Sequence, residues 1–228
     1  MQARLYFAII GDLVDSRGLA APERRALQTR LSAHLGALSP AGKTGVAARP
    51  LITLGDEFQA LFAATDAGIQ SALELMTAVL ELVRPAAVRC GLGVGTLSTD
   101  LQEQALGMDG PCFHRARSAL ERCRSTGLLC QLESDGGPLD SLWSALASYA
   151  LHQRLDWTEA QREAIDLYDE LGAWNKVAAK LGVSPSAVSL RHQAAGWALY
   201  RAARASLPQG LRRVVEMVTE DTAQQERA

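Results

Sequence analysis

The sequence has no arrangement of cysteine and histidine that is typical of a zinc or redox site. No two of its four cysteines, Cys90, Cys112, Cys123 and Cys130, have the C-x-x-C spacing, and no pair of histidines completes a metal-binding pattern. Three of them fall in strand or helix patterns where a small apolar residue would serve. The sequence therefore predicts reduced, mostly buried thiols, as in a cytosolic protein.

Long apolar runs and a strong net charge are also absent. No apolar stretch approaches the ~20 residues of a membrane-spanning helix, and the short N-terminal run lacks the cleavage-like end of a signal peptide. The formal net charge of −2 gives no support for nucleic-acid or membrane affinity of the chain as a whole. With 228 residues, 48% of them hydrophobic, we expect a cytoplasmic globular protein of one large or two small domains and no membrane partner.

The first 133 residues alternate between strand and helix patterns. Strands are predicted at residues 4–14, 51–62 (a hairpin), 87–97 and 128–133, and helices at residues 22–38, 66–84 and 111–126. Residues 39–50 read as a surface loop, and Asp66 as the cap of the second helix. The first six elements make a βαββαβ unit, which is the split ferredoxin-like topology of an α+β domain. In that topology the first strand and the hairpin are neighbours in one sheet.

Three alternating glycines mark the strand at residues 87–97. Gly91, Gly93 and Gly95 all face one side of that strand and leave a strip without side chains. Something must approach this strip closely. A packed helix and a bound nucleotide both satisfy the pattern.

Acidic residues stand at the ends of two strands that this topology makes neighbours. Asp12 follows a buried strand and Asp56 lies at the tip of the hairpin, so we expect them to lie close together. Magnesium, or manganese, prefers a few carboxylates together with waters and substrate phosphates. The candidate metal ligands are Asp12, the backbone carbonyl of Leu13, Asp56 and Glu57. A solvated turn is the alternative for the hairpin acids.

Ser16 and Arg17 follow the first strand and offer a hydroxyl and a guanidinium suited to phosphate. Turn and helix-entry chemistry is the alternative for Ser16.

After Pro138 the pattern becomes purely helical, which places a domain boundary near residues 136–139. We therefore predict a first domain at residues 1–137 and a helical domain at residues 138–228, whose last helix covers residues 201–218. Residues 157–197 fit a helix-turn-helix. Ala178 is small where two helices cross, Gly182 suits the turn, and Val188 faces the first helix.

The second helix of this motif, capped by Ser184, would enter the major groove of DNA. The candidate DNA-binding residues are Lys176, Ser184, Ser186, Ser189, Arg191, His192 and Gln193. Residues 156–204 hold six basic and six acidic residues, so nonspecific DNA affinity should be low. A trihelical packing unit or a dimer module is the alternative.

Three segments, IIGDLVDSR, LITLGDEFQALF and VRCGLGVGTL, resemble in this order the palm domains of class III nucleotide cyclases and GGDEF diguanylate cyclases. More closely, the chain resembles the SatD family, through its IGDxVDSR, TLGDEFQ and GxDGP motifs at residues 10–17, 53–59 and 107–111. The cyclase resemblance implies metal binding by Asp12 and Asp56. It implies nucleotide or phosphate contacts near the cyclase asparagine, arginine and lysine positions, for which the candidates are His114, Arg115, Arg117 and Arg124.

The chain departs from the cyclases at the positions that select the base and stabilise the transition state. Ile52 stands where adenylate cyclases carry a purine-selecting lysine, Ser118 where they carry an arginine, and Leu54 where GGDEF domains carry a glycine. We therefore predict magnesium-assisted nucleotide binding coupled to a DNA-binding helix-turn-helix, in a homodimer, and leave catalytic turnover open. The alternative is a DNA-binding regulator whose palm domain is an inactive sensor or dimerisation module.

Overall fold

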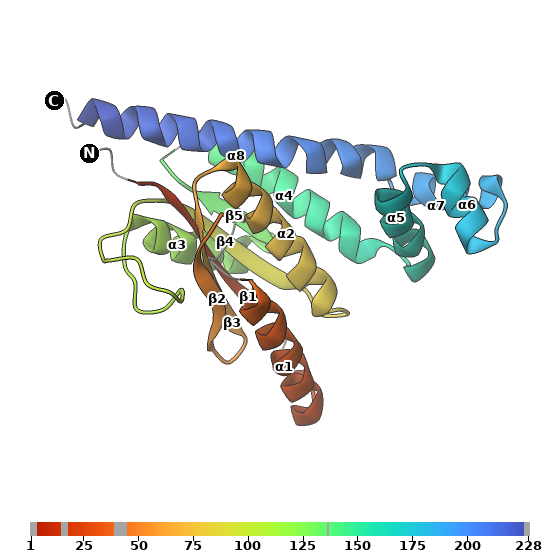
Figure 1. The fold of residues 1–228 in the computed structure, drawn as a ribbon, viewed down its shortest axis with the longest axis horizontal. Coiled ribbons are helices and arrows are strands. Elements are labelled where there is room, and N and C mark those ends of the chain that lie inside the picture. The colour runs from red at the N-terminus through yellow and green to blue at the C-terminus, as the bar shows by residue number, and fades with distance from the viewer. Residues whose placement is uncertain (1–3, 15–17, 39–44, 136, 226–228) are drawn as a thin grey trace.

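A five-stranded sheet forms the centre of the computed structural model, which describes residues 4–14, 18–38, 45–135 and 137–225. The strands are β1 (Tyr6–Leu13), β2 (Val46–Leu54), β3 (Glu57–Ala63), β4 (Val88–Gly95) and β5 (Cys130–Glu133). They lie in the order β2-β3-β1-β4-β5, as Figure 1 shows. β1 is antiparallel to both β3 and β4, and β5 is parallel to β4. The first strand and the hairpin are therefore neighbours, as the sequence predicts.

Helices cover both faces of this sheet. The described residues contain eight, namely α1 (Ala21–Ala37), α2 (Asp66–Leu82), α3 (Pro111–Thr126), α4 (Pro138–Asp156), α5 (Glu159–Leu171), α6 (Trp174–Leu181), α7 (Pro185–Ala194) and α8 (Trp197–Gln225). Because strand side chains alternate between faces, β1 supplies two cores. Phe7 and Ile9 pack with α1, α2, α4 and α8. Tyr6, Ala8 and Ile10 pack with α3.

The glycine strip of β4 is filled by helix α3. A Cβ atom added to Gly91 would lie 2.2 Å from the carbonyl oxygen of Ala116, and one added to Gly93 would lie 2.0 Å from that of Cys112. The α3 backbone therefore rests directly on the β4 backbone. Of the two possibilities for this strip, the packed helix is the one observed.

Helix α4 closes the β5 edge of the sheet with two serines. Ser144 Oγ accepts from the backbone N–H of Leu132 at 2.8 Å. Ser148 Oγ accepts from the N–H of Cys130 at 3.0 Å and donates to its carbonyl at 2.7 Å. Helix α8 then runs back along α4 and α2 (Figure 1). Helices α4 and α8 thus share the core of the sheet.

Helices α5, α6 and α7 form a smaller unit at the end of the molecule away from the sheet (Figure 1). Its core consists of Ala164, Val177, Ala178 and Val188. Among the described residues, no helix combines the length and the apolar content needed to cross a membrane.

Several element ends differ from the sequence prediction. β2 begins at Val46, inside the predicted loop at residues 39–50, of which residues 39–44 lie outside the described part. The cap of α2 is Thr65 and not Asp66, because Thr65 has the extended backbone of a cap and its hydroxyl accepts from the N–H of Gly68. Asp66 lies in the first turn, where its charge suits the helix dipole.

The four cysteines are free and buried, as predicted. Burial raises the pKa of Cys112 to about 11 and that of Cys123 to about 12, so both thiols stay protonated at neutral pH.

Candidate functional site

Asp12 lies at the carboxyl end of the central strand, between an acid and a base. The sheet register places it opposite Glu57 on β3 and opposite Arg89 on β4. Directly paired residues share a face, so all three side chains belong to the α3 face. Asp56 lies in the two-residue turn that precedes Glu57, next to Gly55, whose φ is +61°. Glu57, and not Asp56, is thus the acid directly opposite Asp12.

Two arginines of α3 pair with these two carboxylates. Arg124 donates from Nε and Nη2 to Oδ2 of Asp12, at 2.9 and 2.8 Å. Arg117 holds both oxygens of Glu57, with 2.7 Å between Nη2 and Oε1. The bonds from Arg117 hold the pKa of the Glu57 carboxyl below its usual value, and the same pair raises the pKa of Arg117. Glu57 is therefore charged at neutral pH, and each of the two acids is paired with an arginine of α3.

One oxygen of Asp12 has no such partner. Its carboxylate is 11% exposed, and Oδ1 is buried without a hydrogen-bond partner among the described residues. An unpartnered buried charged oxygen is unfavourable, and a cation would satisfy it. The described residues contain no cluster of three or more acids, histidines or cysteines that could hold a metal ion. Asp12 and Glu57 therefore fit a magnesium ion that keeps waters and arrives with phosphates, and do not fit a permanent all-protein metal site.

An open groove of about 640 Å³ lies beside the hairpin tip. Helix α1 forms one wall, and Ile52 and Gly55 form the other. Gln28 of α1 donates to the carbonyl of Gly55 at 2.6 Å, which fixes the tip against the helix. The groove thus adjoins the turn that carries Asp56.

Two of the remaining phosphate candidates, Arg115 and His114, do not join this site. Arg115 donates to the carbonyl of Val94 at 2.6 Å and pairs with Asp135, and His114 pairs with Asp109 at 2.9 Å. Val94 is opposite Phe7, five residues and roughly 17 Å along β1 from Asp12. Ser16 and Arg17 lie outside the described residues. Leu13 follows Asp12 as the last residue of β1, paired with Val88.

Sequence reasoning missed two residues of the site. Arg89 stands two residues before Gly91 and therefore on the glycine face of β4, which strand alternation could have indicated. Thr53 donates to Oε1 of Glu57 at 3.2 Å across the hairpin. This second contact can be identified only from the register of the two strands, which the sequence does not specify.

The second candidate region is the three-helix unit. Gly182 ends α6 with φ +66°, and Ser184 caps α7 by accepting from the N–H of Ala187 at 3.1 Å. Val188 and Ala178 are buried between the helices. Each constrained position predicted from the sequence is thus occupied as expected.

The DNA-binding candidates differ in exposure. Lys176, Ser184, Ser186 and Gln193 are exposed, whereas Ser189, Arg191 and His192 are partly buried. The ring of His192 stacks on Trp174 with 4.3 Å between centroids. Burial lowers its pKa, so His192 is mainly neutral at pH 7 and contributes packing more than charge.

Charge is segregated within this unit. Helix α5 carries five acids, Glu159, Glu163, Asp166, Asp169 and Glu170. Helices α6 and α7 carry no acidic residue, and hold Lys176, Lys180 and Arg191. Two of the α5 acids are already paired, Asp166 with Arg154 and Asp169 with Arg204. Residues 156–204 are thus neutral in total charge, but helices α6 and α7 within them are basic.

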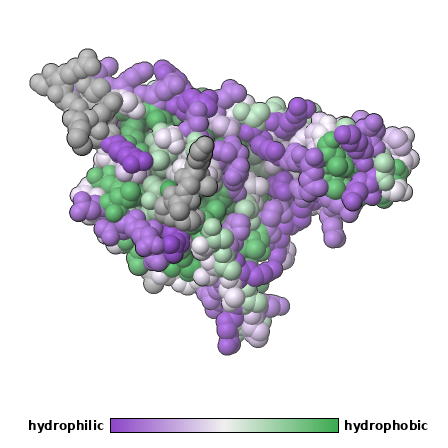
Figure 2. All heavy atoms as spheres, viewed as in Figure 1, coloured by the Kyte–Doolittle hydropathy of each residue, from purple (hydrophilic) through white to green (hydrophobic). Residues whose placement is uncertain are grey.

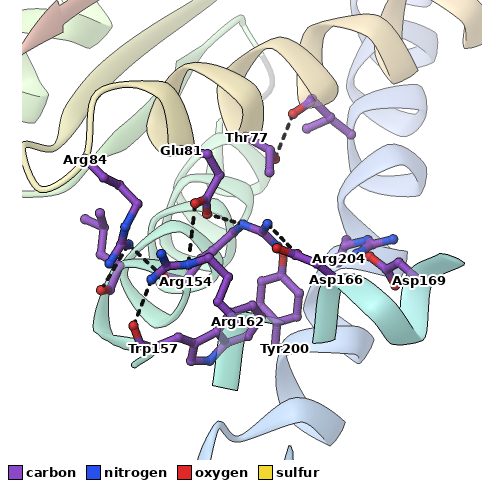
Figure 3. Close-up of polar contacts among 12 residues, drawn as sticks. Thr77, Glu81, Arg84, Arg154, Trp157, Arg162, Asp166, Asp169, Tyr200 and Arg204 are labelled. Atoms are coloured by element: carbon purple, nitrogen blue, oxygen red, sulfur yellow. Dashed lines mark hydrogen bonds and ion pairs between the residues drawn. The ribbon is translucent and has the colours of Figure 1, made fainter. Parts of the chain in front are cut away.

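A network of ion pairs joins this unit to the sheet layers (Figure 3). Arg154 of α4 is 9% exposed and donates to Glu81 of α2 at 2.5 Å and to Asp166 of α5 at 2.9 Å. Arg162 of α5 also lies near Glu81, at 3.5 Å, and donates to the carbonyl of Trp157 at 2.8 Å. A cleft of about 1030 Å³ between α2, α5 and α8 adjoins the network. Nothing in the spacing of these residues along the chain predicts the network.

Comparison with known proteins gives one family and a distant structural likeness. The sequence matches the SatD family over residues 6–209. No curated protein matches. Two solved structures of a bacterial light-regulated adenylyl cyclase are each 18% identical to the chain. The first has a TM-score of 0.37 and covers 58% of this chain and 77% of its own, and the second has a TM-score of 0.35 and covers 57% and 43%.

Proposed function

This chain belongs to the SatD family, and we propose that it binds a nucleotide through a divalent cation at the Asp12 end of the sheet. The observation that carries the proposal is the buried Oδ1 of Asp12, which has no hydrogen-bond partner among the described residues and belongs to a carboxylate opposite Glu57 and beside two arginines of α3. The domain is then a ferredoxin-like palm in which the acids hold the cation.

The charges at this site support such a ligand. In the free protein, Arg117 and Arg124 each neutralise one carboxylate. A magnesium ion would supply both positive charges to Asp12 and Glu57, and thereby release two guanidinium groups. Guanidinium binds phosphate oxygens in a bidentate way. The same four side chains thus suit both the free protein, in which the charges neutralise one another, and a complex with a metal ion and phosphate.

We expect magnesium and a nucleoside triphosphate together to raise the melting temperature of the protein more than either does alone. At a ligand concentration 100 times the Kd, the stabilisation is about 2.7 kcal/mol, or roughly 5–10 °C for a chain of this size. Differential scanning fluorimetry with a panel of triphosphates measures the shift. Asp12→Asn, which keeps the shape and removes the charge, should abolish it.

The matched control is Glu103→Gln, which removes a carboxylate paired with Arg49 on the surface. This variant should keep the full ligand-induced shift. Absence of any shift in the unmodified protein, for every triphosphate with magnesium or manganese, would contradict nucleotide binding. The comparison uses shifts and not absolute melting temperatures, because Asp12→Asn also changes the stability of the free protein.

We further propose that the α5–α7 unit is a helix-turn-helix that binds DNA. The supporting observation is the absence of acids from α6 and α7. Helix α7 would enter the major groove with its N-terminal residues Ser184 and Ser186 toward the bases, while Lys176 reaches phosphates. A homodimer would present two such helices to half-sites about one helical turn apart. Selection of duplexes from a random pool tests this proposal. Enrichment of DNA without a nucleotide-induced shift would favour a regulator whose palm domain binds no nucleotide.

A further inference from the structure

An apolar side chain lies on the outer face of α7, outside the packed core of the α5–α7 unit. Leu190 is 67% exposed and is not among the residues of the α5–α7 core. The inner face of the same helix is formed by Val188, which is fully buried. Figure 2 shows hydrophobic side chains at the surface of this end of the molecule, surrounded by hydrophilic ones. The leucine therefore contributes little to folding.

The neighbours of Leu190 on α7 are side chains that can form hydrogen bonds with a ligand. Ser186 lies four residues before it and Gln193 three residues after it, so all three share one face of α7. Ser186 and Gln193 are both exposed. Gln193 Nε2 donates to Ser189 Oγ at 3.2 Å on the exposed surface, and a base could replace this hydrogen bond. The face thus combines one apolar group with two hydrogen-bonding groups, and the helix carries no acid that would repel DNA.

The chemistry of the major groove offers a specific partner for each group. Thymine alone presents a methyl group there, and adenine presents the N6 donor and N7 acceptor that a glutamine amide matches. We propose that Leu190 is a specificity-determining residue that contacts the C5-methyl group of a thymine, with Gln193 on a nearby adenine. The target half-site then contains A·T pairs under the middle of α7. This assignment rests on the proposed DNA-binding function.

The test replaces thymine with deoxyuridine, which removes the methyl group and keeps base pairing. Using the duplex selected by the full chain, each thymine of the half-site is replaced in turn and the Kd is measured at fixed salt. At one position the unmodified protein should lose about four-fold in affinity, the effect of one buried methyl group. Leu190→Ala should bind the thymine duplex more weakly and show no further loss with deoxyuridine.

Leu142→Ala is the matched control, since Leu142 on α4 is 68% exposed, as Leu190 is on α7. This variant should keep the four-fold discrimination. Equal sensitivity of the unmodified protein and Leu190→Ala to every deoxyuridine, or a selected half-site without thymine, would overturn the assignment while DNA binding stands. A random pool that yields no enriched duplex would overturn the DNA-binding proposal and this assignment together. Circular dichroism of Leu190→Ala confirms that the exposed change leaves the helices intact.

Discussion

Gly93→Ala is expected to destabilise the protein by about 3 kcal/mol or more, a large effect for one added methyl group. The new Cβ would lie 2.0 Å from the carbonyl oxygen of Cys112 and 2.4 Å from the backbone nitrogen of Ala116. Both contacts are with backbone atoms of α3, which cannot rotate away as a side chain could. The helix must therefore lift from the sheet. Urea unfolding followed by circular dichroism measures the loss.

Gly36→Ala is the control for this substitution. Gly36 lies within α1, and a Cβ atom added there would meet nothing within 4 Å. Alanine has the higher helix propensity, so we expect Gly36→Ala to be neutral or to stabilise by up to about 1 kcal/mol. A loss below about 1 kcal/mol for Gly93→Ala would show that α3 does not pack on β4 as closely as described.

Arg154→Met is expected to destabilise the protein by about 2 to 3 kcal/mol, because it removes the charge-assisted hydrogen bonds of a buried guanidinium to Glu81 and Asp166. Arg154 is 9% exposed, and it is the residue that joins Glu81 of α2 to Asp166 of α5. Methionine keeps most of the volume of the side chain, so the loss reports the charge and not a cavity. Equilibrium denaturation monitored by tryptophan fluorescence is suitable, because Trp157 lies beside the guanidinium.

Arg212→Ala provides the comparison at the surface. Arg212 of α8 pairs with Asp66 of α2 at 2.8 Å, but the two side chains are 48% and 74% exposed. Exposed pairs contribute about 0 to 1 kcal/mol. Similar losses for Arg154→Met and Arg212→Ala would contradict the view that burial makes the Arg154 network important. Adding Glu81→Gln to Arg154→Met should recover part of the stability, because it removes a partly buried charge that has lost the closer of its two arginine partners.

Local sequence patterns predict most helices and strands of this protein. The apolar run of β1, the hairpin at residues 51–62 and the Ser184 cap of α7 each depend on neighbours in the chain, and each is present in the structure. The alternating glycines of β4 predict a close approach, but both a helix and a ligand meet that requirement. Only the position of α3 distinguishes them.

Local sequence patterns do not predict the contacts between segments that are distant in the chain. The sequence predicts that Asp12 lies close to Asp56, while the β1–β3 register places Glu57 directly opposite Asp12. The sequence does not fix this register, and a shift of one residue between the strands would turn every side chain to the other face of the sheet. Packing of α4 on β5 depends on two serines whose hydroxyls replace strand partners. A serine in a helix carries no signal that it faces a sheet edge. The Arg154 network joins α2, α4 and α5, and no local sequence pattern indicates that these residues meet.

The glycine strip has a consequence for motion at the Asp12 end of the sheet. Because the α3 backbone touches the β4 backbone at Gly91 and Gly93, the helix cannot approach the strand further, and it can retreat only by opening the core. Arg117 and Arg124 are carried by this fixed helix. Any adjustment to a bound anion therefore occurs by rotation of their side chains, within picoseconds to nanoseconds, and not by displacement of the helix over microseconds to milliseconds. Relaxation-dispersion measurements on α3 should find no exchange that depends on the ligand.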